Sequence, residues 1–271
     1  MSIPTPSLSH LTSADFRHVY EPAEDTFILL DALEQDQSAL RGESPFTSYR
    51  QTSTTPTIEG KTSPAKRPRL CVEIGSGSGC VSTFVGKILG SKSAAILSID
   101  INPRAIDCTS RTGKANQVHL EPVLGNMLSS LKSRAASRQD SRQDGGQVEQ
   151  SAGLIDLLVF NPPYVPTLEE EEALAQQAAG IAGSWAGGQT GTRLVDELID
   201  GRGLEGSVDG IETYLSPGGA FYLVAIRQND PPALVERLQQ RGLDAEIVLQ
   251  RRAGREHLFV IRAIRPTHLD P

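Results

Sequence analysis

Short apolar segments of strand type alternate with segments of helical periodicity along the chain, and this alternation restricts the fold more than any other feature. The expected strands are residues 70–74, 94–100, 121–124, 155–160, 220–226, 246–249 and 257–264. The first expected helix begins near residue 22. The other expected helices cover residues 81–89, 103–116, 168–179, 193–215 and 231–241. Strands that alternate with helices predict a doubly wound, mostly parallel α/β sheet. The last two strands are expected to form a terminal antiparallel hairpin, which gives a seven-stranded Rossmann-like sheet.

Two polar stretches interrupt this pattern. The chain has 271 residues, enough for one α/β domain, and we treat residues 1–271 as a single domain. Residues 41–69 are rich in Ser, Thr and Pro, and residues 132–153 repeat the tetrapeptide Ser-Arg-Gln-Asp. Neither has apolar periodicity, so both are predicted to be mobile insertions. The basic end of the first, residues 61–69, is interpreted as a solvated linker, with a nuclear-import signal as the alternative.

Charge and cysteine content narrow the classes of function. The formal net charge of -7 disfavours binding to nucleic acid, because proteins that bind nucleic acid usually present a basic face to its phosphates. Cys71, Cys80 and Cys108 lack CxxC spacing, so we expect neither a disulfide framework nor a metal site. The sequence has no signal-peptide core and no run of about 18 apolar residues. We therefore expect a cytoplasmic protein with no membrane contact, with a nuclear pool as the alternative noted above.

A glycine-rich turn follows the first expected strand and precedes a helix. It reads Glu73-Ile74-Gly75-Ser76-Gly77-Ser78-Gly79. Its glycines stand at alternate positions, unlike the dinucleotide fingerprint G-x-G-x-x-G, and it lacks the Lys-Ser/Thr of a P-loop. An acidic residue before Gly75 and Gly77 suits a ligand with a cationic amino-acid end. The alternative is a tight strand–helix turn without a ligand.

Asp100 ends the second expected strand. A carboxylate at this position can accept both hydroxyl groups of a ribose. The alternative is a helix N-cap for the helix at Pro103, a role that Asn102 could fill instead. The spacing from Gly79 to Asp100 fits a βαβ unit, so the two motifs together predict a nucleoside-containing cofactor.

The fourth expected strand runs directly into Asn161-Pro162-Pro163-Tyr164. The two prolines stiffen the backbone. The side-chain oxygen of Asn161 and the carbonyl of Pro162 can both accept hydrogen bonds from one NH2 group, and Tyr164 offers a flat face. The motif therefore predicts a site for a planar amide or amino nitrogen, with Asn161, Pro162 and Tyr164 as the catalytic group. The alternative is a rigid turn that leaves the strand.

These segments resemble the HemK-like class I methyltransferases and, within them, the eukaryotic and archaeal release-factor glutamine methyltransferase catalytic subunits. The resemblance covers most of the chain outside the insertions. It is carried by the glycine-rich turn, Asp100 to Pro103, Asp156 to Val165, and two more specific segments, Tyr20-Glu21-Pro22-Ala23-Glu24-Asp25-Thr26-Phe27 and Trp185-Ala186-Gly187-Gly188. It implies a class I methyltransferase fold and S-adenosylmethionine as cofactor.

The resemblance also implies roles for individual residues. Cofactor contacts are expected at Thr26, Glu73, Gly75, Gly77, Asp100 and Asn161, with Asn126 and Met127 at the adenine end. Family members commonly have an Asp where this chain has Asn126, and the Asn side-chain oxygen can still accept from the adenine amino group. Substrate contacts are expected at Asn161, Pro162, Pro163 and Tyr164. Trp185 is expected in a loop near the substrate, with an anchoring role in the core as the alternative.

The implied reaction is N5-methylation of the glutamine in the GGQ motif of the class I translation termination factor, alone or with its GTPase partner. The implied partner is a small zinc-binding activator subunit, which could pair with the third strand if that strand lies at an edge of the sheet. An adenine-N6 methyltransferase on nucleic acid and a protein lysine methyltransferase are the alternatives. An inactive assembly factor is the non-enzyme alternative, and the presence of Gly75, Asp100 and Asn161 counts against it.

Overall fold

The computed structural model describes residues 2–48, 66–90, 93–131, 153–163, 191–201 and 210–267. Within them one sheet has the strand order β3-β2-β1-β4-β5-β7-β6. The strands are β1 (Leu70–Ile74), β2 (Ala95–Asp100), β3 (Glu121–Leu124), β4 (Ile155–Phe160), β5 (Leu215–Ile226), β6 (Asp244–Ala253) and β7 (Glu256–Ile264). Strands β1 to β5 run parallel, and β7 is antiparallel to both β5 and β6. The predicted fold class, including the terminal hairpin and the edge position of β3, is confirmed.

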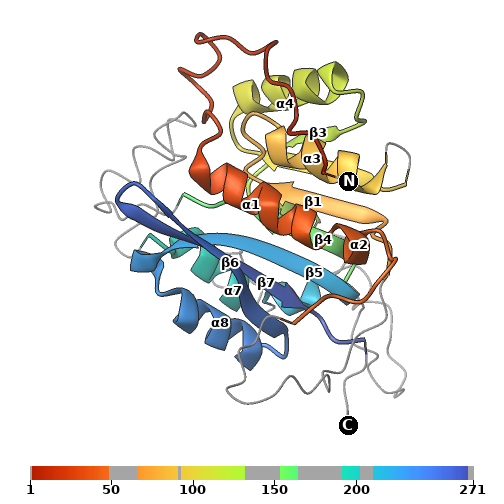
Figure 1. Cartoon of the computed structure of the whole chain (residues 1–271), viewed down its shortest axis with the longest axis vertical. Coiled ribbons are helices and arrows are strands. Elements are labelled where there is room, and N and C mark those ends of the chain that lie inside the picture. Colours follow the sequence, from red (N-terminus) through yellow and green to blue (C-terminus); the bar gives the residue numbers. More distant parts are fainter. Residues whose placement is uncertain are drawn as a thin grey trace.

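Helices cover both faces of this sheet (Figure 1). The described helices are α1 (Glu24–Gln35), α2 (Gln37–Leu40), α3 (Cys80–Leu89), α4 (Pro103–Ala115), α7 (Arg193–Asp200) and α8 (Pro231–Gln240), with 3-10 turns η1 (Ser129–Leu131), η3 (Ile211–Thr213) and η4 (Arg227–Asn229). One apolar core joins α1 and α3 to the sheet, and a second joins α7 and α8 to the opposite face. Helix α4 packs on α3, β2 and β3.

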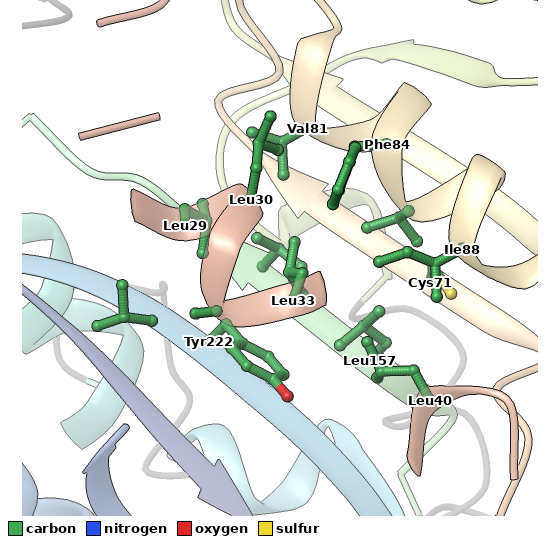
Figure 2. Packing of buried hydrophobic residues seen from close by; sticks show 14 of the residues in the cluster. Leu29, Leu30, Leu33, Leu40, Cys71, Val81, Phe84, Ile88, Leu157 and Tyr222 are labelled. Carbon is green, nitrogen blue, oxygen red and sulfur yellow. The ribbon is translucent and has the colours of Figure 1, made fainter. Parts of the chain in front are cut away.

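Residues along β5 alternate between the two cores, as the two-residue period of a strand requires. Tyr222 and Val224 belong to the core under α1 and α3, whereas Phe221 and Leu223 belong to the core under α7 and α8. Figure 2 shows the first core, in which Leu29, Leu30 and Leu33 of α1 meet Val81, Phe84 and Ile88 of α3 above Cys71, Leu157 and Tyr222 of the sheet. Burying each such side chain contributes about 1.5–3 kcal/mol, so this packing holds α1 against the strands.

Three expected elements have clearly wrong bounds. The strand expected at residues 246–249 is longer, because β6 covers Asp244–Ala253. The helix predicted over residues 193–215 ends at Asp200, because Gly201 adopts a left-handed conformation with φ 72° that caps α7. Strand β5 starts at Leu215, where helix was expected, and includes the turn predicted at residues 216–219. This turn stays in the sheet as an irregular stretch, since Gly218 N donates to Arg265 O at 2.8 Å and Arg265 N donates to Gly219 O at 2.9 Å. The helix predicted over residues 168–179 lies outside the described residues.

The two ends of the first predicted insertion contact the sheet. Near its start, the ring of Phe46 lies 5.0 Å from the guanidinium carbon of Arg262, and the carbonyl of Thr47 accepts from Arg262 Nη2 at 2.6 Å. At its end, Lys66 Nζ donates to Asp156 Oδ1 at 2.7 Å. Residues 49–65 and 132–152, the main parts of the two predicted insertions, lie outside the described residues.

Candidate functional site

The carboxyl ends of the parallel strands place the predicted motifs at one edge of the sheet. Strands β1 and β4 are neighbours, with Ile74 opposite Phe160, so Gly75 and Asn161 follow paired strand ends. On its other side Ile74 lies opposite Ile99, the residue before Asp100. The strand order reverses between β1 and β4, and ligands of open α/β sheets bind at such a reversal. The fold therefore brings the glycine-rich turn, Asp100 and Asn161 together.

The glycine-rich turn bends sharply between β1 and α3. Gly75, Gly77 and Gly79 all have positive φ values, of 71°, 51° and 77°. A side-chain Cβ at Gly75 or Gly77 would meet no atom of the described residues within 4 Å, so the space in front of both is open to a ligand. A Cβ at Gly79 would lie 2.7 Å from the Cα of Thr109, because α4 packs directly against the turn. The turn thus has an open side toward the site and a closed side toward α4.

Glu73 lies beneath this turn and joins β1 to α3. Its carboxylate accepts from Ser82 N at 2.9 Å and from the hydroxyl of Ser82, which in turn accepts from Ser98 Oγ at 2.7 Å. Burial raises the pKa of Glu73 to about 8, against the opposing effect of the bonds from Ser82. The described contacts of Glu73 therefore support the first turn of α3. Its predicted contact with the cofactor stays a prediction.

Asp100 faces the turn from β2. Its two carboxylate oxygens accept from Gly77 N at 2.9 Å and from Asn102 N at 2.8 Å. Burial raises the pKa of Asp100, and these backbone bonds oppose the shift. The helix-capping alternative is wrong for Asp100, because Asn102 caps α4 by accepting from Arg104 N at 2.9 Å. Each oxygen of Asp100 has a further lone pair, so the carboxylate can still accept from ribose hydroxyls.

Asn126 and Met127, predicted at the adenine end, follow β3. Gly125 N donates to Asp100 O at 3.0 Å, which ties this segment to the end of β2. Met127 is buried with a left-handed φ of 50°, and Asn126 is exposed. The structure thus places both residues next to Asp100, on the side of it away from Asn161, and their contact with adenine stays a prediction.

Asn161 is held by a residue that the sequence did not single out. Asn161 Nδ2 donates to Asp25 Oδ2 at 2.9 Å, and the other oxygen of Asp25 accepts from Tyr20 Oη at 2.9 Å and from Thr26 N at 2.7 Å. The oxygen Oδ1 of Asn161 is buried and has no hydrogen-bond partner among the described residues. A buried acceptor without a partner is costly, so this atom points to a ligand that donates a hydrogen bond.

The other predicted substrate contacts are only partly described. Pro162 is buried and Pro163 half-buried directly after Asn161. Tyr164 and Trp185 lie outside the described residues. Thr26 is buried in the first turn of α1, next to Asp25, which contacts Asn161. The predicted contact of Thr26 with the cofactor stays a prediction.

The arrangement fits S-adenosylmethionine. Open space in front of Gly75 and Gly77 gives room for a ligand backbone, and Asp100 keeps acceptors for a ribose.

Among the described residues no group of three or more His, Cys, Asp or Glu side chains is arranged to hold a metal ion. Within the same ranges no helix has the length and apolar character to cross a membrane.

Comparisons with known proteins find relatives over nearly the whole chain. No family model matches the chain. The chain is similar to Methyltransferase HEMK2 of Mus musculus, with 36% identity over 261 residues that cover 96% of each chain. It is 34% identical over 262 residues to the eRF1 methyltransferase catalytic subunit mtq2 of Schizosaccharomyces pombe, covering 96% of this chain and 95% of the relative. A solved structure with the same fold is the E. cuniculi Mtq2–Trm112 complex responsible for methylation of the eRF1 translation termination factor, with a TM-score of 0.54 and 20% identity over 91% of this chain and 98% of the other.

Proposed function

The chain belongs to the HemK-like methyltransferases of the HEMK2 and Mtq2 type, and on that premise we propose that it methylates the N5 nitrogen of the glutamine in the GGQ motif of a class I translation termination factor. The observation that carries the proposal is the buried Oδ1 of Asn161 at the carboxyl end of β4, which has no hydrogen-bond partner in the described parts of the chain. A primary amide has two N–H groups, and this oxygen and the carbonyl of Pro162 are the acceptors that would hold them. The name of the eRF1 methyltransferase relative supports the choice of substrate.

The residues of this chain would bind and orient the reactants. S-adenosylmethionine, when bound, supplies an electrophilic methyl group. The open side of the glycine turn and Asp100 would hold this cofactor, as their free space and spare acceptors permit. Asn161 and Pro162 would hold the amide so that its nitrogen becomes electron-rich in the transition state, which is stabilisation by prearranged acceptors. We assign no general base, so the proton of the amide leaves to solvent.

A small activator subunit is part of the proposal. The S. pombe relative is named a catalytic subunit, and the E. cuniculi protein forms a complex with Trm112. In this chain β3 is an edge strand, and Leu124 on it is 59% exposed while the nearby Ile101 is 46% exposed. Apolar side chains beside an open strand edge favour the addition of a partner strand. The zinc of that partner, the GTPase partner of the substrate and a cytoplasmic location stay predictions.

Methyl transfer from radiolabelled S-adenosylmethionine tests this function. The chain, with and without a co-expressed activator subunit, is incubated with termination factor, with the same factor carrying Asn in place of the GGQ glutamine, with a lysine-rich protein and with DNA. We expect label only on the factor with its glutamine, and more label with the activator present. Label on DNA or on lysine instead would reject the proposal in favour of those substrates, and equal label without the activator would reject the partner.

A further inference from the structure

We propose that Asp25 is a positioning residue that fixes which end of the Asn161 side chain faces the substrate nitrogen. The inference rests on the function proposed above, because it concerns the acceptor that holds the amide. Asp25 lies on α1 and Asn161 follows β4, 136 residues further along the chain. The two side chains meet at 2.9 Å, between Asn161 Nδ2 and Asp25 Oδ2.

The hydrogen-bonding groups of Asp25 and Asn161 permit only one orientation of the Asn161 carboxamide. A carboxylate only accepts hydrogen bonds, whereas a carboxamide has a donating NH2 and an accepting oxygen. The NH2 of Asn161 must therefore face Asp25, since the reverse orientation would set two acceptors against each other. Turning the NH2 to Asp25 turns Oδ1 away from it, and Oδ1 is the buried atom without a partner among the described residues. The proposed acceptor of the substrate N–H is thus selected by Asp25.

Asp25 is itself held in place, as a positioning residue must be. Asp25 is buried, with 3% of the residue exposed. Its Oδ1 accepts from the hydroxyl of Tyr20 and from the backbone N–H of Thr26, so Oδ2 is the oxygen that faces Asn161. It stands in the first turn of α1, where the helix dipole favours a negative charge. The core contacts of α1 keep this turn fixed against the sheet.

The variant Asp25→Asn separates this role from general stability. It keeps the shape of the side chain, and its Oδ1 can still accept from Tyr20 and Thr26. Its NH2 then faces Asn161, whose carboxamide has to turn its oxygen toward position 25 and its NH2 toward the substrate. We expect kcat to fall about 100-fold, as for the loss of one prearranged polar group in other active sites, while the Kd for S-adenosylmethionine stays within about twofold.

A second variant at the same position gives the control. Asp25→Ala removes more of the side chain but leaves Asn161 free to adopt either orientation. The proposal therefore expects Asp25→Ala to keep a higher kcat than Asp25→Asn. A purely structural role expects the opposite order, because the alanine leaves the donors at Tyr20 and Thr26 without their acceptor.

Exchanging the two residues gives the decisive comparison. Asn161→Asp alone places two carboxylates together and is expected to be nearly inactive. In the double variant Asp25→Asn with Asn161→Asp, the NH2 at position 25 donates to the new carboxylate, whose second oxygen faces the substrate as an acceptor. We expect the kcat of the double variant to exceed that of Asp25→Asn alone and that of Asn161→Asp alone by about tenfold or more. Two substitutions that damage the structure independently would not produce this coupling.

The measurements use the full chain with its activator subunit and the intact termination factor, and they report kcat, KM, cofactor Kd and Tm for each variant. Asp25→Asn with kcat within about twofold of wild type, or a double variant no more active than Asn161→Asp, overturns the inference. If Asp25→Asn does not fold, the comparison of the double variant with Asn161→Asp decides. Failure of the proposed function itself is distinguishable, because the wild-type chain would then leave the termination factor unlabelled.

Discussion

At the residue scale, the buried Glu73 carries a pH dependence that stability measurements can detect. Burial raises its pKa from 4.5 to about 8 in the folded chain. Between these values the folded state binds more protons than the unfolded state, so the free energy of unfolding falls as pH rises through this window. One titrating group can change the free energy of unfolding by at most about 1.4 kcal/mol per pH unit.

Replacing Glu73 by Gln removes this titration but keeps an oxygen for the hydrogen bonds from Ser82. We expect the free energy of unfolding of Glu73→Gln, relative to wild type, to rise steadily from about pH 5 to about pH 8. Urea denaturation across this range measures the difference. Parallel curves for the two proteins would show that Glu73 does not change protonation on folding in this range.

At the scale of elements, the close packing of α4 on the glycine turn makes any side chain at position 79 costly. Gly79→Ala meets two costs, a φ of 77° and a Cβ position 2.7 Å from the Cα of Thr109. Gly242, between α8 and β6, has the same φ of 77°, but a Cβ there would meet no atom within 4 Å in the described ranges. We expect Gly242→Ala to cost about 1–3 kcal/mol through φ alone and Gly79→Ala to cost at least about 1 kcal/mol more.

Thermal unfolding of both variants measures these costs, and calorimetric titration gives their Kd for S-adenosylmethionine. Because α4 or the turn must move in Gly79→Ala, we expect weaker cofactor binding in this variant and unchanged binding in Gly242→Ala. Equal stability of the two variants would mean that α4 shifts without cost.

Local sequence signals predicted the elements that depend on local interactions. The bounds of β1, β3 and β4 were predicted to the residue because a turn residue follows each of them directly, namely Gly75, Gly125 and Asn161. The start of β5 was not, since the stretch at Gly218 is held in the sheet by Arg265, far away in the sequence. The difference between local and long-range contacts also explains why the sequence indicated Asp100 as a site residue but not Asp25. Asp100 could be predicted from its position at the end of a strand. As an acidic residue in a helix's first turn, Asp25 gave no signal that it pairs with Asn161, 136 residues away.

At the scale of the whole molecule, a buried ionic cluster joins the start of the chain to its last two strands. Arg262 of β7 is 1% exposed, and its guanidinium donates to Asp36 Oδ2, Glu246 Oε1 and the carbonyl of Thr47, each at 2.6 Å. Asp36 also accepts from Tyr222 Oη at 2.6 Å. Burial and the nearby carboxylate of Asp36 raise the pKa of Tyr222, which stays a hydrogen-bond donor in this cluster.

We expect Arg262→Leu to destabilise the chain by about 3–5 kcal/mol, because it removes the cation that pairs with the buried Asp36 and the half-buried Glu246. Arg251→Leu is the matched control. It breaks a contact between Arg251 of β6 and Asp31 of α1 in which both side chains are more than a third exposed, and is expected to cost at most about 1 kcal/mol. Guanidinium denaturation compares the two. Equal losses in the free energy of unfolding would show that the burial of the cluster does not make its ion pairs more important for stability.

The position of β7 between β5 and β6 has a consequence for the order in which the sheet is assembled during synthesis. Strand β6 precedes β7 in the chain, yet the strand it pairs with is β7. A nascent chain that has just exposed β6 therefore has no strand to pair with it until β7 has been synthesised and has paired with β5. Assembly runs out of step with translation here, so a chain interrupted between the two strands loses both of them.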